Sequence, residues 1–188
     1  MPTQPNGHLS VDARSAGEVY LETARFEFAR LRRLAEAAIA QAPSAAAIHH
    51  RLSEETNSIG ILIRHLTGNL RSRWTDFLTT DGEKSDRNRE SEFDPCDHLS
   101  REELLVEWDA AFALADRVMS GLDPADLART VHVRGEALLV QEAIQRQIVH
   151  LAYHTGQIVL LARITTPDWI SLSIPRGASP DFRRRYKQ

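Results

Sequence analysis

Cysteine is nearly absent from this chain of 188 residues, because Cys96 is the only one. A single cysteine excludes an intrachain disulfide and also a zinc site built on a pair of cysteines. No stretch approaches the roughly 18 consecutive apolar residues of a membrane-spanning helix. The polar residues 1–14 also lack the basic start and apolar core of a secretion signal. We therefore expect a cytoplasmic protein that does not contact a membrane.

An excess of positive charge is also missing. The sequence has 23 Lys and Arg against 26 Asp and Glu, which gives a formal net charge of −3. A nucleic-acid-binding domain usually concentrates positive charge on one face. The one dense basic run, Arg183 to Arg185 with Lys187, lies near the end of the chain, where we interpret it as a solvated tail. We expect no nucleic acid among the partners.

Four segments carry apolar residues at helical spacing, and these are residues 15–42, 57–80, 100–120 and 137–164. Ser15 with Glu18, and Ser100 with Glu103, fit the reciprocal capping box that begins a helix. Gly121 is expected to end the third helix in a left-handed conformation. The segments predict an all-α protein, an up-and-down four-helix bundle with long loops and an irregular C-terminal tail.

The remaining segments show no helical pattern. Residues 1–14 are predicted to be a flexible arm, 15–166 the bundle and 167–188 the irregular tail. Residues 83–97 are polar and longer than an ordinary connection, which is typical of a functional or mobile loop. Residues 130–134 alternate like a short strand, but a lone strand leaves its edges unpaired, so we interpret them as loop.

Histidine is the residue type most relevant to chemistry, with eight in the chain. His150 and His154 are four positions apart, so they lie one turn apart on one helix face and can hold a single ion. On spacing alone, two histidines bonded to their neighbours are the simpler interpretation. His65 lies on the flank of the apolar stripe of residues 57–80. Three imidazoles from two facing helices would leave an open coordination position, as in catalytic zinc sites.

The chain resembles the DinB-like (YfiT-like) superfamily of metal-binding four-helix bundles, in a bacterial branch of unknown function. Three blocks carry the resemblance: residues 57–84 (NSIGILIRHLTGNLRSRWTDFLTTDGEK), 130–163 (TVHVRGEALLVQEAIQRQIVHLAYHTGQIVLLAR) and 172–177 (LSIPRG). The chain departs from the branch at Ser85-Asp86, where an aromatic often follows the DGEK turn, and this puts a substrate contact by that loop in doubt. By this resemblance His65, His150 and His154 bind one divalent ion, with zinc or nickel as the first candidates.

Other residues of these blocks are secondary candidates. Asn69 lies four positions from His65, and Gln157 seven from His150, so each could support a metal ligand or contact a substrate. Tyr153 is expected to pack on another face. For one further group we expect buried Arg–Glu pairing that ties the last helix to the preceding connection: Arg73, Arg134, Glu136, Glu142 and Arg146.

The resemblance also implies a function, because superfamily members include S-transferases and isomerases that use a small thiol. A metal-dependent enzyme that activates a low-molecular-weight thiol for attack on a small-molecule substrate is therefore the leading hypothesis. The sequence names no catalytic residue beyond the metal ligands. Metal-assisted hydrolysis, and a non-catalytic bundle stabilised by its metal as a homodimer, stay open as alternatives. Imidazoles must be neutral to bind, so metal affinity is expected to fall below about pH 6.5.

Overall fold

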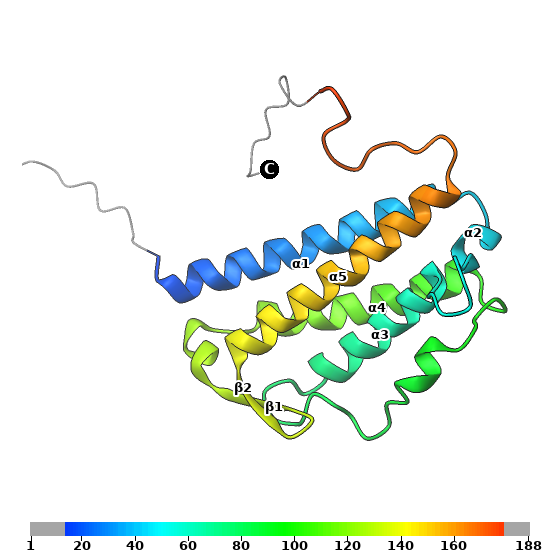
Figure 1. The fold of residues 1–188 in the computed structure, drawn as a ribbon. Helices are drawn as coiled ribbons and strands as arrows, with labels where there is room; N and C mark the ends of the chain where they lie inside the picture. The colour runs from blue at the N-terminus through cyan, green and yellow to red at the C-terminus, as the bar shows by residue number, and fades with distance from the viewer. Residues whose placement is uncertain (1–13, 179–188) are drawn as a thin grey trace, which may run out of the picture.

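The computed structural model describes residues 14–178, and this part of the chain is mostly helical (Figure 1). Its elements, in chain order, are α1 (Ala16–Gln41), α2 (Ala45–His49), α3 (Ile59–Trp74), the 3-10 helix η1 (Glu90–Phe93), α4 (Arg101–Ser120), the 3-10 helix η2 (Pro124–Ala128), β1 (Thr130–Val133), β2 (Glu136–Leu139) and α5 (Val140–Thr165). Residues 167–178 form no helix or strand. The predicted arm up to residue 13 and the basic run at 183–187 lie outside the described residues.

Both predicted capping boxes begin their helices. The Ser15 hydroxyl accepts the Glu18 N–H at 3.2 Å while the Glu18 carboxylate accepts the Ser15 N–H at 2.6 Å. Ser100 and Glu103 repeat the arrangement at the start of α4. Each box satisfies backbone N–H groups that the first helical turn leaves without partners.

Two predicted helix ends are wrong. We expected the second long helix to reach about residue 80, but α3 ends at Trp74 because Asp76 adopts a positive φ of 47° and the chain turns away. Gly121 is not left-handed, since its φ is −87°. Its N–H instead closes the last turn of α4 by bonding to the carbonyls of Arg117 and Val118.

The interpretation of residues 130–134 as loop is also wrong, because β1 pairs antiparallel with β2. The two connecting residues, Arg134 and Gly135, have φ values of 57° and 75°, as a tight hairpin turn requires. The Asp81 carboxylate accepts their two N–H groups at 2.8 and 2.7 Å, and the Gly82 N–H donates to the His132 carbonyl at 2.7 Å. The hairpin is thereby fastened to the loop that follows α3.

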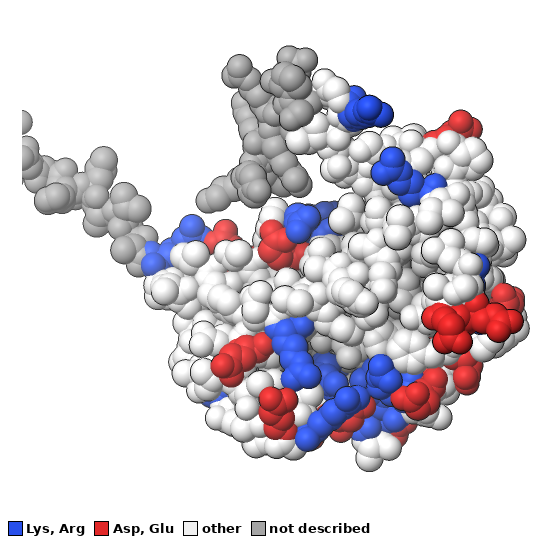
Figure 2. Space-filling view, in the orientation of Figure 1, with Lys and Arg blue, Asp and Glu red and all other residues white. Residues whose placement is uncertain are grey.

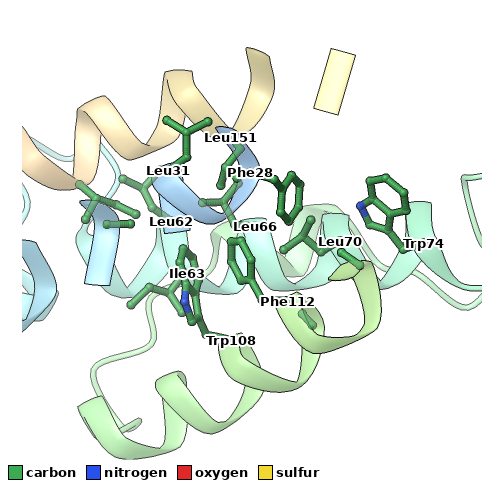
Figure 3. Close-up of a cluster of buried hydrophobic side chains, with 14 of the residues drawn as sticks. Phe28, Leu31, Leu62, Ile63, Leu66, Leu70, Trp74, Trp108, Phe112 and Leu151 are labelled. Atoms are coloured by element: carbon green, nitrogen blue, oxygen red, sulfur yellow. The ribbon is translucent and has the colours of Figure 1, made fainter. Parts of the chain in front are cut away.

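The long helices pack in pairs, α1 along α5 and α3 along α4, and α3 also contacts α5 (Figure 1). The core lies between them, and Figure 3 shows its aromatic side chains meeting aliphatic ones from α1, α3 and α5. The Phe112 ring lies 5.4 Å from Phe28 and 4.5 Å from Trp108, between centroids. Residues of all four long helices contribute to this core. No helix within residues 14–178 has both the length and the apolar character needed to cross a membrane.

Candidate metal centre

The three predicted histidines meet where α3 faces α5. The Nε2 atom of His150 lies 3.1 Å from the Nε2 of His65 and 3.1 Å from the Nε2 of His154. One ligand atom from each of the three residues lies within 4.8 Å of the other two. His65 and His154 are buried and His150 is half-buried. The structure thus brings together side chains that are 85 positions apart in the chain.

Proton counting at this triad favours a cation. The Nδ1 of His65 lies 2.9 Å from a carboxylate oxygen of Glu92, and an ionised carboxylate only accepts, so the Nδ1 carries the proton. The Nδ1 of His154 donates in the same way to the Oε1 of Gln157 at 2.8 Å. In the neutral rings both Nε2 atoms therefore present lone pairs toward His150. A proton on the His150 Nε2 can serve only one of them, whereas one metal ion satisfies all three.

Glu92 was missed by the sequence analysis, although it orients His65. It lies 27 positions along the chain, in η1, within the loop expected to be functional or mobile. Arg87 binds its two carboxylate oxygens at 2.8 and 2.9 Å, and Arg64 holds the carbonyls of Ser91 and Asp94, which fastens this loop to α3. No local sequence pattern identifies a functional glutamate in such a loop. The unusual length of the loop was the only signal that this segment has a function. A carboxylate behind a histidine is the usual support of a metal ligand.

Gly68 on α3 provides the space that Glu92 occupies. A Cβ at this position would lie 2.2 Å from the Oε1 of Glu92 and 2.8 Å from its Cδ, which is closer than real Cβ contacts of 3.0 Å or more. Gly68 follows His65 by three positions, so it lies on nearly the same helix face. The glycine inside an otherwise ordinary helix therefore serves the approach of Glu92 to the histidine.

The electrostatic surroundings keep two of the rings neutral. Burial is the main reason that the pKa of His150 falls to about 3. Repulsion from the other two histidines, when they are protonated, and from Arg73 and Arg87 lowers it further. Burial also lowers the pKa of His154, although its bond to Gln157 opposes the change. Burial raises the pKa of Glu92, but its bonds to His65 and Arg87 outweigh this and leave it lowered. Near neutral pH His150 and His154 are therefore neutral imidazoles and Glu92 is an ionised carboxylate, the forms that metal binding requires.

A cavity of about 400 Å³ opens beside the triad. Asn69 and Gln147 line it, and both are more than nine-tenths buried. The Oδ1 of Asn69 and the Nε2 of Gln147 have no hydrogen-bond partner, and neither has the Nδ1 of His150. Tyr153, expected to pack, is instead 65% exposed and lines the cavity. Buried polar groups without partners are rare, and these three belong to residues that line the cavity.

The expected Arg–Glu tie exists, but it is exposed. Arg146 on α5 lies 3.3 Å from Glu136 of the hairpin, and their side chains are 59% and 64% exposed. The Glu142 carboxylate instead accepts the Leu139 N–H at the start of α5. A half-buried pairing does occur elsewhere, because Arg73 donates to Glu83 and to the Gly82 carbonyl.

Fold and site together define a mostly helical protein with a buried histidine triad that could hold a metal ion. Residues 15–178 match the model of the family described as "Protein of unknown function (DUF1572)", so the chain belongs to this family. No curated protein matches the chain.

Proposed function

We propose that His65, His150 and His154 bind one divalent metal ion, zinc or nickel first, within a DinB-like four-helix bundle. The observation that carries this proposal is the convergence of three Nε2 atoms, two of which are held as acceptors by Glu92 and Gln157. Three nitrogen ligands leave a position open for an outside group. Asn69 faces the adjacent cavity and would contact that group.

We further propose that this outside group is a small thiol and that the protein is a thiol S-transferase. A bound divalent ion would lower the pKa of the thiol and supply a thiolate nucleophile. The residues of the chain would hold the metal ligands in orientation and position the second substrate in the cavity. The cavity supports a catalytic over a purely structural role, because a site kept only for stability has no need of an open space beside the metal ligands.

Metal-assisted hydrolysis is the second candidate, and the cavity lining argues against it. Among the described residues, no Asp or Glu lines the cavity to take a proton from an attacking water. The Glu92 carboxylate already accepts hydrogen bonds from His65 and Arg87, so it does not serve as that base. Thiol transfer depends less on such a base, because a thiol bound to the metal would release its proton to solvent outright, whereas a metal-bound water keeps a pKa of about 7.

Two measurements test these proposals in order. Metal content of untagged protein should be one ion per chain, and His154→Ala should lose it, whereas full occupancy in that variant would refute the ligand assignment. The metal-loaded protein is then mixed with a candidate thiol and an electrophile such as 1-chloro-2,4-dinitrobenzene. Conjugate formation that requires both metal and thiol supports transfer. Hydrolysis of an ester substrate without thiol supports the second candidate. Unfolding on chelation, with neither activity, would favour the metal-stabilised homodimer.

A further inference from the structure

The lining of the cavity beside the histidine triad is rich in arginine. Five arginines line it, and no acidic residue does so within the part of the chain that the structure describes: Arg73, Arg87, Arg89, Arg134 and Arg146. Figure 2 shows Lys and Arg side chains gathered on this face, below α5, with acidic side chains among them. The acidic partners bind the arginines from outside the lining, so the interior of the cavity presents guanidinium groups.

Two of these arginines are used by the protein itself. The side chains of Arg73 and Arg87 are only 17% and 5% exposed, and both are bound by Glu83, with Arg87 also bound by Glu92. Glu83 is shared further, since its carboxylate also accepts from Arg134 at 3.0 Å. The Glu83 carboxylate is therefore shared by three guanidiniums, one of which also binds Glu92.

The outer arginines are available for a ligand. Arg134 contacts Glu83 through its Nε at 3.0 Å, so its terminal nitrogens take no part in that bond. Arg146 has only the exposed pair with Glu136 at 3.3 Å, and exposed pairs of this kind contribute little. A guanidinium fork recognises a carboxylate or a phosphate through paired hydrogen bonds.

We propose that the cavity binds a small organic acid whose carboxylate or phosphate lies between Arg134 and Arg146. Arg146 precedes His150 by one turn of α5, roughly 6 Å along the helix axis. A short molecule can therefore place its acid group at the arginines and its other end at the histidine triad. The proposal rests on the proposed function for the role of the metal, whereas the acid site itself depends only on the arginines and the cavity.

Three matched thiols test it: 3-mercaptopropionate, its neutral amide 3-mercaptopropionamide, and 2-mercaptoethyl phosphate. Affinities are measured by calorimetry on zinc-loaded and metal-free protein after the metal content has been determined. An acid thiol should bind about tenfold more tightly than the amide, the value of one charge-assisted hydrogen-bonded pair. The stronger of the two acids identifies the acid group.

Variants then assign the preference to residues. Arg134→Gln combined with Arg146→Gln should reduce the acid-to-amide ratio to within about twofold, with metal content and amide affinity unchanged. Arg163→Gln, at the far end of α5, is the control and should keep the ratio. Equal binding of acid and amide by the unmodified protein, or a preference that survives the double substitution, would overturn the proposal. If no metal binds but metal-free protein still prefers the acid, the metal proposal fails and the acid site stands.

Discussion

Replacing Gly68 by alanine should weaken metal binding without touching any metal ligand. The added Cβ would lie 2.2 Å from the Oε1 of Glu92, and real contacts are 3.0 Å or longer, so the carboxylate must retreat from α3. Arg87 donates hydrogen bonds to both carboxylate oxygens, so Glu92 cannot rotate aside without losing them. The 2.9 Å bond from Glu92 to His65 is then lost or lengthened. Loss of such a supporting partner typically lowers metal affinity about 10–100-fold.

The chain offers a matched control for this substitution. Gly156 is also a helical glycine, it lies two positions from His154, and a Cβ there meets nothing within 4 Å. Gly156→Ala should keep wild-type metal affinity and gain about 1 kcal/mol of stability from helix propensity. Zinc affinity of both variants is measured by competition with a chromophoric chelator. Equal affinities in the two variants would refute the argument that Glu92 orients His65 through the space at Gly68.

Three further predictions concern stability and pH. The backbone N–H groups of Glu83 and Gly135 lower the pKa of Asp81 to about 2, so its contribution is complete above its unfolded pKa of 3.8 and is lost as pH falls through 2. Because Asp81 is partly exposed, Asp81→Asn should lower the free energy of unfolding in urea by about 1 kcal/mol at neutral pH. If this difference between variant and unmodified protein were as large at about pH 2 as at neutral pH, the assignment would be contradicted. Leu66 is fully buried, so Leu66→Ala should lower the free energy of unfolding by about 3 kcal/mol. The control Leu160→Ala, at an exposed position, should lower it by less than about 0.5 kcal/mol. Similar losses in the two variants would show that the core is placed wrongly. The pKa of His150 is lowered to about 3, so metal affinity should start to decrease only at a pH lower than the 6.5 expected of ordinary histidines. A decrease in affinity with its midpoint at pH 6.5 would argue against the buried site.

The sequence predicted those features that are coded locally. Ser15 and Ser100 begin their helices because a capping box needs only residues three positions apart. The spacing of His150 and His154 placed both on one face of α5. The position of His65 on the flank of its apolar stripe suggested a third ligand, and the resemblance supported it. Single-helix periodicity carries no information on which helix lies opposite.

The features that sequence reasoning missed depend on tertiary contacts or on short elements. Glu92 reaches His65 from a loop without periodicity, and its role became visible only when η1 was found against α3. The β hairpin was missed because residues 136–139 could equally begin the following helix, so β1 had no visible partner. The five residues of α2 span too few turns to show an apolar stripe.

X-ray absorption at the zinc edge of metal-loaded protein tests the central claim most directly. Coordination by the three imidazoles predicts nitrogen ligands at about 2.0–2.1 Å, with the multiple-scattering pattern of histidine rings and one further light ligand. The His154→Ala protein should lose that pattern or the metal. A shell made only of oxygen, or a histidine pattern unchanged in the variant, would contradict a metal site at the meeting of α3 and α5.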